Sequence, residues 1–292
     1  MIISHVIGGL GNQMFQYAIG KARAVACRTE LRLDISDYSR YSLHQGFELE
    51  RIFVAPIVHA EKVDIQNVLG WQSSYWARKI LRRSQASWLR KKSLVVEPNF
   101  AYWPEILETT SNSYLTGNWQ SEKYFVDIES ILRKDFSFRQ DAQGLNAHLE
   151  NQMRDENSVS LHIRRGDYVT NSHTNAVHGV CSPEYYKKAI AHVSLKVENP
   201  SFYIFSDDMA WVKANFVLPF RHTYVEHNVG AESYNDMRLM SLCRHHVIAN
   251  SSFSWWGAWL NQRTEKLVIA PKHWFAENQD VSDLFCPNWV SL

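Results

Sequence analysis

The sequence predicts an α/β fold made of two domains. Short apolar runs recur along the chain, and each is followed by Gly, Asn, Ser or Asp and then by a helical pattern, which is the order of strand, turn and helix in parallel-sheet proteins. The 292 residues, 45% of them hydrophobic, are enough for two cores of ordinary size. A polar stretch over residues 139–157 contains few large apolar side chains. We therefore expect one domain over residues 1–150 and a second over 151–292.

The chain opens with a predicted strand over residues 1–7, a glycine-rich loop over 8–12 and a helix over 14–26. Glycine permits a tight turn and close approach, so the backbone N–H groups of Gly9 and Gly11 could reach an oxyanion beside the positive end of the helix. The spacing matches neither of the common glycine-rich phosphate loops, and a purely structural turn stays an alternative. Asn12 either caps the helix or reaches into a site.

The second half predicts a run of strands whose carboxyl ends carry polar side chains. We expect strands over 158–163, 202–205, 223–225, 246–249 and 266–270, and a helix over 232–242. In open α/β sheets, ligands bind beyond the carboxyl ends of the strands. The sequence therefore predicts a binding site at this edge.

The strand over 158–163 leads into Arg164-Arg165-Gly166-Asp167. Adjacent side chains of a strand point to opposite sides, so one arginine can face a ligand while the other is anchored elsewhere. A guanidinium group suits the geometry of a phosphate. Asp167 either holds an arginine in place or touches the substrate. His162 lies on the same strand face as Arg164 and is either a ligand contact or a core histidine.

Two other strand ends carry candidate ligand groups. Asp207 and Asp208 follow the strand over 202–205 and either accept hydrogen bonds from a nucleobase or cap the next helix. The sequence has no Asp-x-Asp pair of the kind that holds a divalent ion against a diphosphate, so we expect no metal. Asn250, Ser251 and Ser252 begin a helix and form either an anion site or an ordinary N-cap.

Composition narrows the class of partner. A formal net charge of +1 gives no reason to expect nucleic acid, whereas eleven tryptophans suit stacking on sugars or bases. Residues 78–92 carry seven basic side chains, which form either a solvated helix face or a contact with an anionic membrane surface or acidic acceptor. The four cysteines lack metal-ligand spacing, and residues 1–7 are too short for a signal peptide or a membrane span. We expect a cytoplasmic protein, with peripheral contact at the inner membrane as the open alternative.

Four segments in this order resemble the α-1,2-fucosyltransferases of glycosyltransferase family 11, in particular the small bacterial members that decorate surface polysaccharides. The segments are residues 8–18, 162–168, 205–208 and 250–257, and the resemblance covers nearly the whole chain. It implies a GT-B-like architecture of two Rossmann-like domains facing a central cleft. The second domain would bind GDP-fucose without a metal or other cofactor, and the first would bind a glycan or O-antigen unit that ends in galactose.

The resemblance also implies roles for individual residues. Arg164 would contact the β-phosphate, Asp208 would read guanine, and Ser251 or Ser252 would contact phosphate. Asn12 would lie by the reacting centre, where the 2-hydroxyl of galactose attacks and GDP-β-L-fucose is inverted to an α-fucoside.

The general base is not decided by the sequence. Asp167 is the first choice, His173 and His178 follow it in the same expected loop, and a mechanism without a dedicated base stays open. A transferase for another nucleotide sugar and a non-catalytic nucleotide-sugar-binding protein are the alternative functions.

Overall fold

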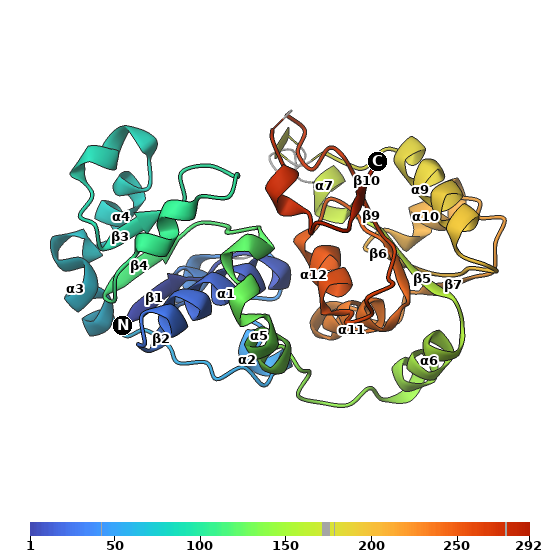
Figure 1. Cartoon of the computed structure of the whole chain (residues 1–292), viewed down its shortest axis with the longest axis horizontal. Coiled ribbons are helices and arrows are strands. Elements are labelled where there is room, and N and C mark those ends of the chain that lie inside the picture. Colours follow the sequence, from blue (N-terminus) through green and yellow to red (C-terminus); the bar gives the residue numbers. More distant parts are fainter. Residues whose placement is uncertain (42, 171–175, 178, 278) are drawn as a thin grey trace. The chain divides into compact units, whose positions relative to one another are not determined.

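The computed structural model describes residues 1–41, 43–170, 176–177, 179–277 and 279–292, and the chain divides into two compact α/β units (Figure 1). The first unit comprises Met1–Arg139 and Ser282–Leu284, and the second comprises Gln140–Val281 and Phe285–Leu292. The first unit thus ends before residue 150, the boundary expected from the sequence, because α6 (Gly144–Asp155) packs on α11 (Tyr234–Leu242) of the second unit.

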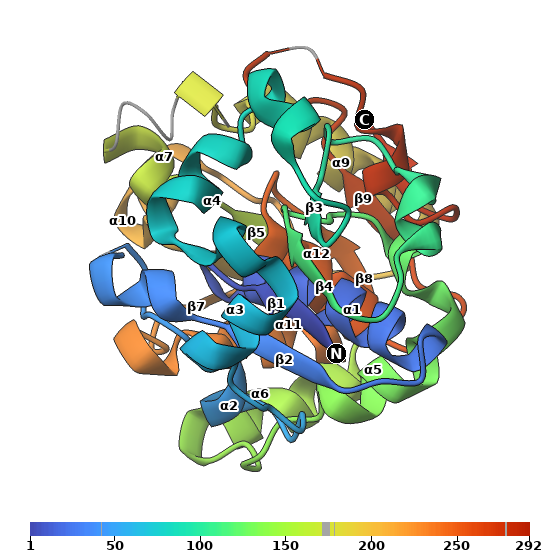
Figure 2. The ribbon, with the colours of Figure 1, turned by 90° about the vertical axis from the view of Figure 1, so that its left-hand side faces the viewer.

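The first unit is built on a four-stranded parallel sheet with the strand order β2-β1-β4-β3 (Figure 2). Its strands are β1 (Ile2–His5), β2 (Leu31–Asp34), β3 (Leu94–Val96) and β4 (Ser113–Thr116). Its α-helices are α1 (Leu10–Ala26), α2 (Leu49–Ile52), α3 (Lys62–Leu69), α4 (Tyr75–Leu81) and α5 (Glu129–Asp135). Its short 3₁₀ helices are η1 (Ser36–Arg40), η2 (Gly70–Ser73), η3 (Ser84–Leu89), η4 (Pro104–Glu108), η5 (Glu122–Tyr124), η6 (Val126–Ile128) and η8 (Ser282–Leu284).

Helix α1 begins inside the glycine run, earlier than the sequence predicted. Gly9 is its N-cap, so Gly11 and Asn12 belong to the first turn of the helix and Asn12 is not the cap. Gly8 takes a φ of +95°, a conformation that favours glycine. Its carbonyl accepts hydrogen bonds from Gln13 Nε2 at 3.0 Å and from Tyr38 Oη at 2.7 Å. Side chains from α1 and η1 therefore fix the turn in one conformation.

The second unit contains a six-stranded parallel sheet with the order β10-β9-β8-β5-β6-β7. Its strands are β5 (Ser158–Ile163), β6 (Ser201–Ser206), β7 (His222–Val225), β8 (His245–Val247), β9 (Val268–Ala270) and β10 (Val290–Ser291). Its remaining helices are α7 (Gly166–Thr170), α9 (Pro183–Lys196), α10 (Met209–Asn215), α12 (Ser252–Leu260) and the short η7 (Gly230–Glu232). The five strands that the sequence predicted here are confirmed.

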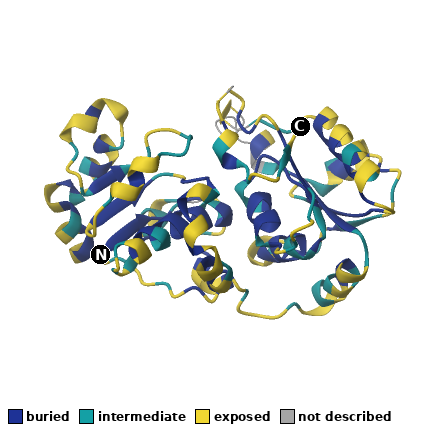
Figure 3. Cartoon of the chain, in the orientation of Figure 1, coloured by how far each residue is buried: buried dark blue, intermediate teal, exposed yellow. Residues whose placement is uncertain are grey.

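Strand β5 lies inside this sheet and is buried at every position (Figure 3). Alternate side chains of β5 enter a cluster that α9 completes, with Val159, Leu161, Ile163 and Tyr185 among its members. A separate cluster joins β6 to α6 and α11. Apolar clusters cover the sheet, so the polar residues that follow the strands lie together at its carboxyl end.

The order of the strands indicates where a ligand would bind at this sheet. From β5 the chain adds β6 and β7 on one side, and it then crosses to add β8, β9 and β10 on the other. The connections leave β5 and β8 in opposite directions, and a crevice opens at such a switch point in open α/β sheets. The residues after β5 and β8 therefore flank the expected binding position.

None of the helices in the described ranges is both long and apolar enough to cross a membrane.

Candidate active site

Arg164 and Asp207 form an ion pair at the carboxyl ends of β5 and β6. Arg164 Nη1 lies 3.0 Å from Asp207 Oδ2, and the two side chains are 23% and 25% exposed. The other carboxylate oxygen, Oδ1, accepts the backbone N–H of Arg165 at 2.8 Å. One carboxylate thus holds both the arginine side chain and the backbone of the turn that follows β5.

The two arginines follow the last residue of β5 and are held by different partners. Arg165 stacks over Trp211, with its guanidinium carbon 3.6 Å from the ring centroid, and its Nε lies 3.3 Å from Asp208 Oδ2. Arg164 instead lies over the Tyr168 ring at 5.4 Å. Arg165 is therefore anchored against α10, and Arg164 is the better candidate for a phosphate ligand.

Asp207 and Asp208 have different hydrogen-bond partners, which the sequence did not decide. Asp208 is the N-cap of α10, since its Oδ1 accepts the backbone N–H of Trp211 at 3.2 Å. Asp207, for which capping was also considered, braces the turn after β5 instead. Asp208 remains partly exposed, so the cap leaves part of its carboxylate open to a ligand.

Gly166 is required by the closeness of this turn to Asp207. A Cβ atom at Gly166 would lie 2.4 Å from Asp207 Oδ2 and 2.8 Å from its Cγ. Carbon and oxygen atoms that are not bonded do not approach so closely, so any side chain here would push the carboxylate away. The glycine thus serves the turn by making room for the carboxylate that holds Arg164.

His162 lies in β5, two residues before Arg164, and is a buried neutral imidazole. Its pKa is lowered to about 4, chiefly by burial and also by the charge of Arg164, against the raising effect of Asp207. Its ring packs 6.1 Å from Phe253 of α12, and its Nδ1 has no hydrogen-bond partner among the described residues. The core alternative accounts for its packing, and contact with a ligand stays a prediction.

Asn250 and Ser251 lie between β8 and α12, and Ser252 is the first residue of α12. Asn250 is buried and donates from Nδ2 to the carbonyl oxygens of Trp274 at 3.2 Å and Gly179 at 3.3 Å. Ser251 occupies the N-cap position of α12, but its side chain makes no capping hydrogen bond, and Ser252 is partly exposed. An ordinary N-cap therefore does not account for the two serines. Asn250 instead connects two loops through its hydrogen bonds to Gly179 and Trp274.

Three of the predicted residues lie wholly or partly outside the described part of the structure. The backbone of Asp167 belongs to α7, but its side chain is outside the described part of the structure, as are His173 and His178.

In the first unit, Asn12 accepts a hydrogen bond from Gln120 Nε2 at 2.9 Å. Gly9 lies against the imidazole of His44, which an added Cβ would meet at 3.4 Å.

Glu97 is a candidate that the sequence analysis missed. It directly follows β3, and its carboxylate accepts the backbone N–H groups of Asn118 at 2.6 Å and Trp119 at 3.0 Å. Burial nevertheless raises its pKa to about 7, against the lowering effect of these hydrogen bonds. Trp119 takes a φ of +56°, which is uncommon for a large side chain. The sequence carries a signal for Glu97, because this residue directly follows a short apolar run, as the candidate residues at the other strand ends do.

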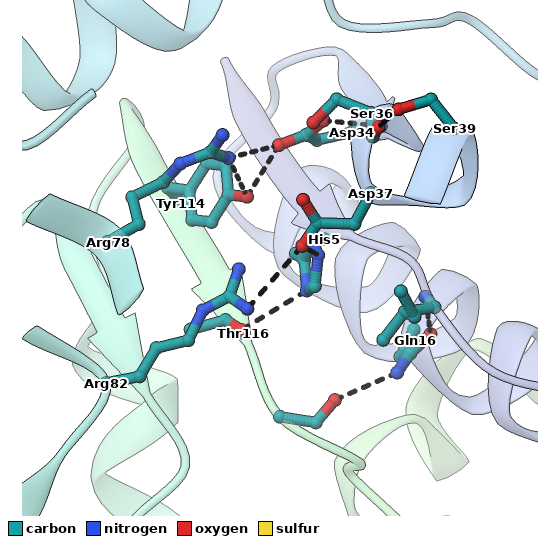
Figure 4. Close-up of polar contacts among 12 residues, drawn as sticks. His5, Gln16, Asp34, Ser36, Asp37, Ser39, Arg78, Arg82, Tyr114 and Thr116 are labelled. Carbon is teal, nitrogen blue, oxygen red and sulfur yellow. Dashed lines mark hydrogen bonds and ion pairs between the residues drawn. The ribbon is translucent and has the colours of Figure 1, made fainter. Parts of the chain in front are cut away.

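A second missed group lies at the ends of β1 and β2 (Figure 4). His5 Nε2 is hydrogen-bonded to Asp37 Oδ2 at 3.0 Å, and burial lowers the pKa of His5 although Asp37 raises it. Asp34 accepts hydrogen bonds from Arg78 and from Tyr114. These contacts join segments far apart in sequence, so only the tertiary structure reveals them.

No three His, Cys, Asp or Glu side chains gather to hold a metal ion within the described ranges. The expectation of a metal-independent reaction stays a prediction.

Comparison with known proteins places these features in a family. The model of "Glycosyl transferase family 11" matches residues 91–292. An alpha-1,2-colitosyltransferase of Escherichia coli is 35% identical, over 100% of this chain and 99% of its own length. The O-antigen biosynthesis glycosyltransferase WbnK of Escherichia coli is 31% identical, over 98% of each chain.

Solved structures support the fold. The NodZ alpha-1,6-fucosyltransferase soaked with GDP-fucose matches with a TM-score of 0.51 and 16% identity, over 89% of this chain and 91% of that one. NodZ from Bradyrhizobium in selenomethionine form matches with a TM-score of 0.52 and 14% identity, over 88% and 90%. The α/β fold of GT-B type expected from the sequence is thereby confirmed.

Proposed function

Because the chain belongs to glycosyl transferase family 11, we propose that it transfers L-fucose from GDP-β-L-fucose to the 2-hydroxyl of a terminal galactose in an O-antigen unit. Glycosyl transfer of the O-antigen type follows from the family and the relatives; the donor, the linkage and the acceptor sugar are the proposal. The observation that carries it is Arg164, held by Asp207 after β5 at the switch point of the six-stranded sheet.

The chemistry of an inverting transfer assigns Arg164 its task. The acceptor oxygen forms a bond to the anomeric carbon, and the bond from that carbon to the β-phosphate oxygen breaks with its electron pair, so negative charge grows on the diphosphate. A preorganised guanidinium aimed at this charge stabilises the transition state by a few kcal/mol. Backbone N–H groups of the first turn of α12, near Ser251 and Ser252, would add to this field.

The remaining roles follow from the same assignment. Asp208, partly exposed beside its helix cap, would accept hydrogen bonds from guanine. Asn12 would lie near the reacting centre, with its side-chain oxygen already fixed by Gln120.

The four cysteines are free thiols, which supports a reducing, cytoplasmic location.

Asp167 is the candidate from sequence for the base that takes the proton of the attacking hydroxyl. The pH dependence of kcat tests this role, because the acid limb of the profile should disappear in Asp167→Asn.

The second candidate donor is a nucleotide-linked colitose, which the 35% identity to an alpha-1,2-colitosyltransferase favours. The two proposals share the phosphate site and differ only in the pocket around the sugar.

The deciding experiment offers the purified chain GDP-fucose, GDP-colitose and GDP-mannose with a panel of galactosides, and NMR determines the product linkage. An α-1,2-fucosylated galactoside as the main product supports the proposal. Preference for GDP-colitose by tenfold or more in kcat/KM would assign the chain to colitose, and binding of a donor without any transfer would indicate a non-catalytic protein.

A further inference from the structure

The exposed tryptophans of this chain are confined to one segment of the first unit. Trp71, Trp76 and Trp88 are 56%, 68% and 80% exposed, whereas the other eight of the eleven tryptophans are buried or half-buried. Two further large apolar side chains of the same segment, Ile80 and Leu89, are also exposed. Single exposed apolar residues are ordinary, but five within so short a segment indicate a contact surface.

The same segment carries positive charge without any negative charge. Residues 65–96 contain no Asp or Glu, and seven basic side chains fall between 78 and 92. Four of them, Lys79, Arg83, Lys91 and Lys92, are exposed, and none forms an ion pair with a carboxylate of the described ranges. The surface is therefore apolar and cationic at once.

The other three basic residues hold this surface in place. Arg78 is buried and is hydrogen-bonded to Asp34 and Tyr114, and Arg82 Nη1 lies 3.7 Å from Asp37 Oδ2. Figure 4 shows both arginines directed toward these partners. Arg90 donates hydrogen bonds to the backbone oxygens at 81, 82 and 83. The seven cations thus divide into three that fix the scaffold and four that face solvent, so the basic segment is not simply a solvated helix face.

The exposed side chains belong to one continuous surface. Helix α4 packs on both η2 and η3, which carry Trp71 and Trp88. Lys79 Nζ lies over the Trp76 ring at 5.4 Å. The backbone N–H of Lys91 donates to Gln72 Oε1 at 3.0 Å, which brings the lysines after η3 next to Trp71. We name this set, Trp71, Trp76, Lys79, Ile80, Arg83, Trp88, Leu89, Lys91 and Lys92, the tryptophan face.

We propose that the tryptophan face binds the surface of a bilayer that contains anionic phospholipid. Tryptophan favours the depth of the lipid head groups, and lysine and arginine beside it attract phosphate. A protein partner explains the composition less well, because protein interfaces are enriched in tryptophan but depleted of lysine, whereas three of the four exposed cations are lysines. The chain would be held at the membrane surface without crossing it.

Vesicle sedimentation of the full chain tests this proposal. Wild-type protein should sediment with vesicles of phosphatidylglycerol and phosphatidylcholine and much less with phosphatidylcholine alone. The variant Trp88→Ser/Lys91→Gln/Lys92→Gln should bind the mixed vesicles at least about thirty-fold more weakly from its two lost charges alone. Absence of binding by wild-type protein, or equal binding to neutral vesicles, would overturn the proposal.

A matched variant of the second unit controls for charge and hydrophobicity. Leu195→Ser/Lys188→Gln/Lys196→Gln also removes one exposed large apolar side chain and two exposed lysines, from α9. It should bind vesicles as tightly as wild-type protein. An equal loss in both variants would mean that net charge alone controls binding, which contradicts a defined surface.

Tryptophan fluorescence separates a lipid surface from an acidic macromolecule. Brominated phospholipid should quench wild-type emission, and the quenching should fall in Trp76→Ser/Trp88→Ser. Both sets of variants should keep wild-type transfer to a water-soluble acceptor, which shows that they fold. Vesicle binding without any quenching would overturn insertion of the tryptophans at the interface.

Discussion

Replacement of Arg164 by alanine is the most direct test of the active site. The variant removes the guanidinium that lies 3.0 Å from Asp207 Oδ2 and leaves the backbone of the turn intact. Asp207 keeps its hydrogen bond from the Arg165 N–H at 2.8 Å. The fold therefore loses the ion pair with Asp207 and the contact with the Tyr168 ring, and the reaction loses the cation that we assign to the leaving diphosphate.

The two losses differ enough in size to be told apart. The side chains of Arg164 and Asp207 are each about a quarter exposed, and ion pairs open to solvent contribute about 1 kcal/mol or less to stability. For a chain of this length, that lowers Tm by about 2–4 °C. Loss of one preorganised donor to a developing charge costs about 3–4 kcal/mol, or about 10²- to 10³-fold in kcat. The loss of activity should therefore far exceed the loss of stability.

The assay measures GDP release with a galactoside acceptor at saturating GDP-fucose, beside thermal unfolding of the same samples. Arg164→Lys should recover only part of the rate, since an ammonium group keeps the charge but not the fork. Arg154→Ala, which removes an exposed arginine paired with Glu150 on α6, is the control and should leave kcat unchanged. Turnover of Arg164→Ala within about twofold of wild type would refute the assignment of the phosphate ligand.

Three further variants test the surroundings of the site. Gly166→Ala places a methyl group 2.4 Å from Asp207 Oδ2, so the displaced carboxylate should lower kcat about tenfold while the urea midpoint changes little, since the methyl also favours the helix. His162 has a pKa of about 4 in the fold and about 6.5 unfolded; the unfolded state binds more protons between these values, so stability should fall by up to ~3 kcal/mol as pH drops through this window, and urea titrations of His162→Asn should lack that loss. Glu97, with a folded pKa of about 7, has the opposite effect, because stability should fall by a similar amount as pH rises from about 4.5 to 7; an unchanged pH dependence in Glu97→Gln would contradict the raised pKa.

The sequence by itself determined five strands of the second unit and the carboxyl ends at which its polar residues stand. Strand β5 spans the predicted residues 158–163, and Arg164, Asp207 and Asn250 stand at strand ends as expected. These features are local: an apolar run that ends in glycine or a polar residue specifies a strand and its end with little help from the rest of the chain. The order of the motifs was also enough for the resemblance to family 11.

Only the tertiary structure decided how the polar groups divide their tasks. Asp207 holds Arg164, a pairing of residues 43 positions apart, and Asp208 rather than Asp207 caps α10. Helix α1 takes in Gly11 and Asn12 because Gln13 of α1 itself and Tyr38 of η1 fix the turn at Gly8. The physical reason is that a charged side chain has several possible partners nearby in sequence, and the one it takes depends on which strand ends the sheet brings together.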